Sequence, residues 1–578
     1  MVDGPAASIG EFPWELQKIC HARRLSLGPA RRGQPDSLDV HLSGFEGTSL
    51  VTHLYRKLTL GCSALALAAC GADDIASPGT GGDVIINNPP APAPSPTTPP
   101  PVSTVTPAAG CPTIPGAGLT DGGTISGPTG TYRICTMPAR FTASATLPYV
   151  RGLLYQMNGR VDVGTDGGPA ADASDGASDT NVTLSIESGV IVYASGASFL
   201  IVNRGNRINA VGTVARPIVF TSRDNVQGLN EGRDASSGQW GGVVLAGRAP
   251  VTDCIAPGAT PGSVNCERQV EGSAQPALFG GATNNDSSGT MRYVQIRYSG
   301  FVLSGDAELQ SLTTGGTGTG TQLSHIQSHN SSDDGVEFFG GSVNAKYLAV
   351  IGAEDDSIDT DTGVRANLQY VIAVQRQGAG DSILEVDSTN ALVDSLPRQL
   401  TQVSNATFIA RAPAGAALLR FRGGTDYALV NSVVVSAANT GCLRIDDAAT
   451  IRAADSGLQD QGPPRFESVV LDCTTPFVNG SGGGATAAQT EAIFRAGSNN
   501  RSPFTNTLTA TFVNSTNEAG VPAFNPTALS SFFNAVSYIG AVRDASDTSF
   551  RGWTCNSSTA NFGASNTGNC DSLPVYPA

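Results

Sequence analysis

The clearest candidates for chemistry in this sequence are the acidic residues between positions 333 and 361. Eight Asp or Glu lie in this stretch, against a single Lys, and the block Asp333–Glu337 is followed 22 residues later by the similar block 355–359. If the two blocks stack as neighbouring strands about 4.8 Å apart, their carboxylates repel unless one is protonated or a cation lies between them. Ca²⁺, which binds six to eight oxygen ligands, suits such a cluster. The predicted calcium ligands are Asp334, Glu337, Asp356, Asp359 and Asp361, extended by Asp381, Glu385 and Asp387.

The alternative is a solvated turn edge whose acids cap backbone amides. No known calcium loop supports the metal: residues 359–363 only half-resemble an EF-hand, and residues 315–320 have Gly where the calcium-binding nonapeptide needs Asp.

Two histidines are the second candidate for chemistry. His325 and His329 are four residues apart and precede Asp333 and Asp334. A His beside carboxylates can serve acid–base catalysis. His325, His329, Asp334 and Asp356 are therefore weak catalytic candidates, and no catalytic residue is assigned. The alternative is a polar strand face with satisfied His side chains.

A row of aromatic residues is the third candidate. Tyr293, His325, Tyr347 and Tyr370 occupy equivalent positions on four successive predicted strands, while Val294, Leu348 and Val371 point to the opposite, inward face. An outward aromatic row can bind a sugar or a partner protein. It can also stabilise the stack of strands, and we favour that role.

The repeat spacing sets the fold that positions these residues. His325, Tyr347 and Tyr370 each begin an equivalent strand, and these starts are 22 and 23 residues apart. A unit of this length, with short apolar runs, frequent Gly and no helical pattern, fits one coil of a parallel β-helix. Propeller blades need about 40–50 residues. We therefore predict an all-β, single-stranded solenoid of the parallel β-helix type.

The N-terminal region reads as an export and anchoring segment. Leu67-Ala68-Ala69-Cys70 follows a short apolar run and looks like a bacterial lipobox, which implies lipidation of Cys70. The run from Leu58 is too short to span a bilayer. We divide the chain into 1–50, a mis-called extension or disordered leader; 51–69, a lipoprotein signal peptide; 70–110, the lipidated Cys and a Pro-rich linker; and 111–578, the β-helix domain with a C-terminal cap.

Cysteine usage supports export. Eight of the 11 Cys lie after Cys70, an even number that indicates disulfides in an exported chain. Their spacing favours four local pairs, each worth about 2–4 kcal/mol in the chain-entropy description. The spacing argues against zinc. The predicted pairs are Cys111–Cys135, Cys254–Cys266, Cys442–Cys473 and Cys555–Cys570.

The charge excludes one class of partner. The net charge of −15 leaves no basic stripe that could neutralise phosphates, so we expect no nucleic-acid partner.

Several motifs between residues 120 and 560 resemble those of a largely uncharacterised family, the exported right-handed parallel β-helix lipoproteins of Gram-negative bacteria. The resemblance implies a right-handed solenoid. Because Gly71, not Asp, follows the lipidated Cys, it also implies an outer-membrane lipoprotein that faces the periplasm or the cell surface. Some members appear to accompany TonB-dependent receptors, which makes such a receptor a candidate partner. The motifs are Glu187–Val190, 211–213, 216–222, Gln239–Gly242, Ser332–Gly341 and Gly552–Thr554.

These observations predict an outer-membrane-anchored β-helix protein that binds or scaffolds a glycan or a membrane-protein partner. The alternatives are a carbohydrate-active enzyme, a polysaccharide lyase or hydrolase working at residues 333–361, and an adhesin. The blocks typical of β-helix hydrolases are missing, and no spacing singles out Lys346 or Arg365 as a lyase base. We therefore favour a binding protein that requires no cofactor, with calcium as its one candidate ion.

Overall fold

The fold is described here from a computed structural model. The structure describes residues 105–576, with gaps at 234, 272, 274–275, 305–306, 389–391, 412–416, 437–440 and 482. The predicted signal peptide, Cys70 and almost all of the Pro-rich linker lie outside the described residues. Among the described residues, no helix is long and apolar enough to cross a membrane.

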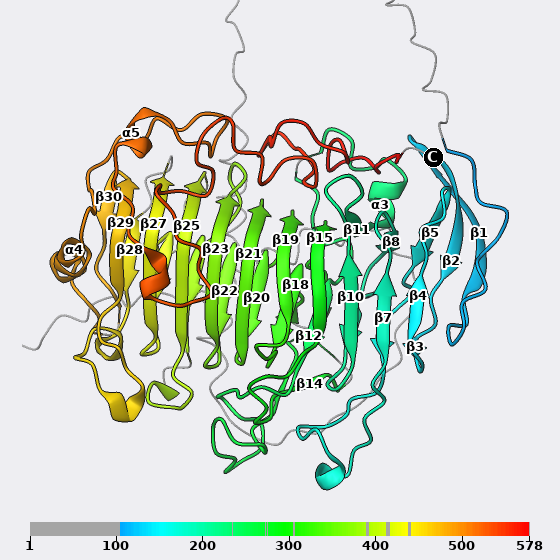
Figure 1. Cartoon of the computed structure of the whole chain (residues 1–578), viewed down its shortest axis with the longest axis horizontal. Helices are drawn as coiled ribbons and strands as arrows, with labels where there is room; N and C mark the ends of the chain where they lie inside the picture. Colours follow the sequence, from blue (N-terminus) through cyan, green and yellow to red (C-terminus); the bar gives the residue numbers. More distant parts are fainter. Residues whose placement is uncertain are drawn as a thin grey trace, which may run out of the picture. The chain divides into compact units, whose positions relative to one another are not determined.

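Two long sheets of parallel strands run side by side along the domain (Figure 1). The chain winds from one sheet to the other in each coil, so the prediction of a parallel β-helix is confirmed. The 15-stranded long sheet contains β1(Thr120–Gly127), β2(Gly130–Thr136), β4(Ala145–Leu147), β5(Leu153–Gln156), β7(Thr183–Ile186), β8(Ile191–Ala194), β10(Arg207–Val211), β11(Ile218–Ser222), β15(Gly289–Arg297), β19(Gln322–His329), β21(Ser342–Ile351), β23(Arg365–Val374), β25(Leu400–Ala410), β27(Asp426–Ser436) and β29(Arg465–Asp472).

The 11-stranded second sheet forms the other wall. Smaller elements project from the coils or cap them. The second sheet contains β3(Arg140–Phe141), β6(Val161–Val163), β9(Leu200–Val202), β12(Val243–Ala246), β18(Leu312–Gly315), β20(Val336–Phe339), β22(Ile358–Asp361), β24(Leu384–Val386), β26(Leu419–Phe421), β28(Gly441–Ile445) and β30(Thr475–Phe477). The smaller elements are β13(Arg268–Gln269), β14(Leu278–Phe279), β16(Val302–Ser304), β17(Ala307–Glu308), α3(Arg223–Val226), α4(Ala487–Ala496), α5(Thr516–Ala519), η1(Ala173–Asp175), η3(Ala448–Thr450), η4(Ser456–Leu458) and η5(Pro526–Ala528).

The repeat length found in the sequence is real but local. Ser324 pairs with Lys346 and Lys346 with Gln369, at separations of 22 and 23 residues. Gln369 then pairs with Ser404, because a loop lengthens that coil. Inward side chains such as Val336 and Phe338 join one continuous apolar core.

Both ends of this core are covered. At the first coil, β1 and β2 form an antiparallel pair. At the last coil, α4 begins with a capping box formed by Thr486 and Gln489. Phe494 of α4 packs on Phe466 and Phe477, with ring centroids 5.6 and 5.4 Å apart. The caps keep the terminal coils from exposing core side chains and unpaired strand edges.

The long strands of the long sheet bend in the middle. The two halves of β15 pair with two different strands, β10 and β11, and the residue between the halves has a left-handed backbone. His325, Tyr347 and Tyr370, expected to begin strands, instead lie inside β19, β21 and β23 at such bends. The bend recurs in seven successive coils, at Tyr293, His325, Tyr347, Tyr370, Asn405, Asn431 and Ser468, with φ between 51° and 61°.

Residues 499–576, here called the C-terminal segment, run back along the outer face of the long sheet (Figure 1). Its contacts reach from the later coils to the early ones: Phe524 bonds Asn431, and the Tyr576 hydroxyl donates to the carbonyl of Pro217. Buried rings of the segment, including Phe550 and Trp553, pack on Ile351 and Ile372 of the sheet. The sequence analysis expected only a cap here.

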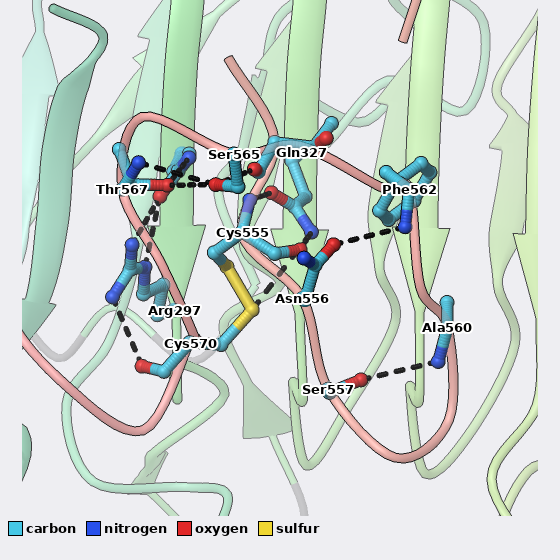
Figure 2. Close-up of a disulfide and its surroundings, with 12 residues drawn as sticks. Arg297, Gln327, Cys555, Asn556, Ser557, Ala560, Phe562, Ser565, Thr567 and Cys570 are labelled. Atoms are coloured by element: carbon cyan, nitrogen blue, oxygen red, sulfur yellow. Dashed lines mark hydrogen bonds between the residues drawn. A yellow bond between two sulfur atoms is a disulfide. The ribbon is translucent and has the colours of Figure 1, made fainter. Parts of the chain in front are cut away.

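Outward amide side chains fasten this segment to the sheet. Gln327 donates to the carbonyl of Cys555 (3.0 Å) and accepts from its N–H (2.8 Å), as Figure 2 shows beside the Cys555–Cys570 disulfide. Gln369 makes the same pair of bonds with Asn534. Each amide thus acts as a short piece of strand that pairs with the segment.

All four predicted disulfides are present: Cys111–Cys135, Cys254–Cys266, Cys442–Cys473 and Cys555–Cys570. Disulfides of this number are typical of proteins that fold outside the reducing cytoplasm.

We expect Gln327→Leu to destabilise the domain by about 2–4 kcal/mol, because it leaves the buried N–H and C=O of Cys555 without their partner. Gln322→Leu is the matched control, since Gln322 is exposed on the same strand. Denaturant unfolding measures the loss. Equal stability of the two variants would contradict the clamp.

Candidate functional site

The acidic residues gather on the outer face of the second sheet and at the turns before its strands. Glu337 of β20 pairs with Asp359 of β22, which pairs with Glu385 of β24. Alternation places Asp361 outward as well, because Ile358 faces the core. Asp334 and Asp356 lie at the preceding turns. The name acidic row is used for Asp334, Glu337, Asp356, Asp359 and Asp361.

The carboxylates of the acidic row are close and mostly buried. Oxygens of Asp334, Glu337 and Asp359 all lie within 4.8 Å of one another. Asp334, Glu337 and Asp356 are each only 6% exposed. Two full negative charges at this separation repel by about 3.5 kcal/mol at an effective dielectric constant of about 20. All three groups cannot carry full charge here without compensation.

Part of the acidic row has a structural role. One oxygen of Asp334 accepts the N–H of Asp356 (2.9 Å), and one oxygen of Asp356 accepts the N–H of Ser382 (2.6 Å). These bonds link the turns of successive coils, as the alternative reading of the sequence expected. Asp359 and Asp361 each accept the N–H of the following residue.

No Arg or Lys of the described residues forms an ion pair with a member of the acidic row. The two acids of the next coil differ, because Glu385 pairs with Arg420 and Arg422 (3.3 and 3.2 Å) and Asp387 pairs with Arg422. Glu385 and Asp387, expected as extensions of the calcium site, are therefore neutralised by arginines. The acidic row carries the uncompensated charge.

Arg420 and Arg422 were missed by sequence reasoning. They follow Asp387 by more than 30 residues, and only the loop between β24 and β26 brings them into the next coil. Lys346, named in the sequence as a nearby base, lies elsewhere: its amine donates to Asn534 of the C-terminal segment (2.9 Å) and sits over the Phe532 ring.

Burial and mutual repulsion raise the pKa of every group in the acidic row. The pKa of Asp334, Glu337, Asp356 and Asp359 lies well above the ordinary value for a carboxyl, first because of burial and then because of neighbouring carboxylates. The same causes raise the pKa of Asp361 to about 7. Hard cations with oxygen ligands, such as Ca²⁺, favour the charged form of such a cluster.

The two histidines are packing groups of the long sheet. Burial and Arg292 lower the pKa of His325 to about 4, and burial with Arg297 and Arg376 lowers the pKa of His329 to about 3. His329 is fully buried against Tyr298, with ring centroids 5.3 Å apart. Imidazoles with these pKa values are neutral and weakly basic at pH 7.

Tyr293, His325, Tyr347 and Tyr370 form a stacked ladder at the bends of the long sheet. Neighbouring ring centroids are 4.3, 4.4 and 4.7 Å apart. Each stacked pair contributes about 0.5–1.5 kcal/mol, which is comparable to the cost of about 1–2 kcal/mol for a left-handed residue. Because the ring faces pack on one another, the aromatic ladder presents edges and hydroxyl groups outward.

Comparison with known proteins identifies one family. A family model described as a pectate-lyase-like β-helix domain matches residues 176–508, more than half of the chain. No curated protein and no solved structure gives a significant match.

The raised pKa values predict an unusual pH dependence of stability. A carboxyl whose pKa is higher in the folded than in the unfolded chain binds protons preferentially in the folded state, so its stabilising effect is lost as pH rises. In EDTA, we expect the melting temperature to fall as pH rises from about 4 through 7, the region of Asp361. Ca²⁺ should remove most of this fall. A melting temperature that is independent of both would contradict the prediction.

Proposed function

Because the chain belongs to the family of pectate-lyase-like β-helix domains, we propose that it is an exported protein that binds an acidic polysaccharide through Ca²⁺ ions held on the acidic row. The observation that carries the proposal is the set of five stacked carboxylates without a basic partner among the described residues. Three of them supply oxygens within 4.8 Å of one another. Ca²⁺ takes six to eight oxygens, so such a group leaves coordination positions for the carboxylates of a bound chain.

The outer face of the second sheet also fits an extended ligand. The acidic row spans the coils of β20 and β22, and the coils of β24 and β26 add Arg420 and Arg422 in register with it. A polysaccharide lying along the solenoid would meet the cations first and the guanidinium groups next. Both kinds of group attract uronate carboxylates.

Cleavage of the polysaccharide is the second candidate function. The pKa of Asp361, about 7, suits a general acid at neutral pH. Two features favour binding instead. Ion pairs with Glu385 and Asp387 raise the pKa of Arg422, so it does not act as a base. The central carboxylate oxygens lie within 4.8 Å, closer than the roughly 5–9.5 Å of glycosidase pairs.

We expect calorimetry to show Ca²⁺ binding that is weakened at least tenfold in Glu337→Gln and Asp359→Asn. Polygalacturonate should bind the protein with Ca²⁺ and not with EDTA, because the cation bridges two sets of carboxylates. Glu491→Gln is the matched control, since Glu491 is exposed on α4 and pairs only with Arg495.

Three results would separate the alternatives. Ca²⁺ binding without polysaccharide binding would reduce the site to a structural metal centre and leave an adhesin or a scaffold for a membrane receptor. Unsaturated products or new reducing ends, lost in Asp361→Asn, would establish a lyase or a hydrolase. No heat with Ca²⁺ would remove the basis of the proposal.

The proposed location is the outer membrane. The lipobox-like sequence that ends at Cys70 supports a lipid anchor, Gly71 supports the outer membrane, and the Pro-rich stretch after it supports a tether that holds the domain away from the bilayer. The domain would then face the periplasm or the cell surface, where a TonB-dependent receptor is a candidate partner.

Cys70→Ser should abolish lipidation and move the protein from the membrane fraction to the soluble extracytoplasmic fraction. Metabolic labelling with a fatty acid and fractionation of the cells measure both effects. Cys62→Ser, inside the apolar run, is the control and should leave both unchanged. Unaltered labelling of Cys70→Ser would disprove the anchor.

A further inference from the structure

A groove separates the aromatic ladder from the C-terminal segment. Its volume is about 560 Å³, and it is open to solvent. Ligand sites of proteins typically measure about 300–1,000 Å³. One wall is the ladder, with Tyr293, His325 and Tyr347; the other consists of residues 548–552 and 564–566 of the C-terminal segment, and Val214 closes one side.

Several contacts fix the walls of this groove. The Asn566 amide donates to the carbonyl of Val214 (2.9 Å), and Arg551 donates to the carbonyl of Ala545 (2.7 Å). Trp553 lies behind the ladder, 6.1 Å from Tyr293 and 5.5 Å from His325 between ring centroids. The Cys555–Cys570 disulfide joins the two stretches of segment that flank it.

The charge of the groove differs from that of the rest of the protein. The chain carries a net charge of −15, yet Arg551 is the one charged residue among the described residues that line the groove. Arg292 adds a second guanidinium at the end of the ladder, 4.9 Å from the centre of the Tyr293 ring. A guanidinium that faces a groove without a carboxylate favours an anionic ligand.

The other lining groups favour a hydroxyl-rich ligand. Thr548, Ser565, Asn566 and the two tyrosines bring polar atoms to the groove, while Val214 offers an apolar contact and is 44% exposed. A few polar groups around a partly apolar surface are typical of sugar-sized ligand sites.

We propose that the groove between the aromatic ladder and the C-terminal segment is a second binding site, for an acidic oligosaccharide whose negative group pairs with Arg551. This site is separate from the acidic row and needs no metal. The ladder contributes its hydroxyl groups and ring edges, and the C-terminal segment contributes the cation.

The test uses the full-length protein in EDTA, so that any Ca²⁺-dependent binding at the acidic row is absent. Short oligogalacturonates, sulfated oligosaccharides and neutral oligosaccharides of the same length are titrated separately. Calorimetry gives the affinities, and the fluorescence of Trp553 reports on the groove itself. The two acidic probes should bind, and the neutral probe should bind at least tenfold more weakly.

Two variants place the ligand. Arg551→Gln should weaken binding of the acidic probes at least tenfold, and Arg551→Lys should restore part of it. Tyr347→Phe removes one hydroxyl but keeps the ring in the ladder, and should weaken binding several-fold. Arg543→Gln is the matched control, because Arg543 lies on the same segment, is 54% exposed and pairs with Asp544 outside the groove. Melting curves verify that each variant is folded.

Equal affinity for neutral and acidic probes, unchanged affinity in a folded Arg551→Gln variant, or no binding of any probe would overturn the proposal. The result is independent of the proposed function: binding at the acidic row is lost in EDTA and in Glu337→Gln, whereas binding in the groove is affected by neither.

Discussion

The constraint on which the structure depends is the register between coils. Parallel strands about 4.8 Å apart place each side chain above its equivalent in the next coil, so a residue type that recurs along the sequence becomes a row in space. A row of apolar side chains becomes a core, and a row of rings becomes the aromatic ladder. A row of carboxylates becomes a site that must bind protons or cations.

The two outer faces resolve this constraint differently. On the long sheet, stacking between rings offsets the strain of the left-handed bends, and outward amides bind the C-terminal segment. That face is therefore largely covered. On the second sheet, arginines neutralise Glu385 and Asp387 but leave the acidic row uncompensated. The difference between the faces places the charged candidate site on one and the groove on the other.

Sequence reasoning reached the fold because the coils at β19, β21 and β23 carry few insertions, so the pairs Ser324–Lys346 and Lys346–Gln369 keep the 22–23 residue spacing. The same spacing predicted that Glu337 meets Asp359. It failed for Arg420 and Arg422, because the loop before β26 hides their register, and for the bends at His325 and Tyr347, because a left-handed residue inside a strand leaves no mark on the apolar pattern. The disulfides followed from proximity in the chain, which short loops favour.

By itself, the sequence determined the solenoid, the four disulfides and the stacked carboxylates, because each depends on contacts that are local or periodic along the chain. Only the tertiary structure decided which acids lack a partner and what covers the aromatic ladder. Both depend on segments that meet across long separations, such as Gln327 with Cys555 and Glu385 with Arg420. No spacing encodes such a meeting, since it is set by how the loops and the returning segment pack against the finished coils.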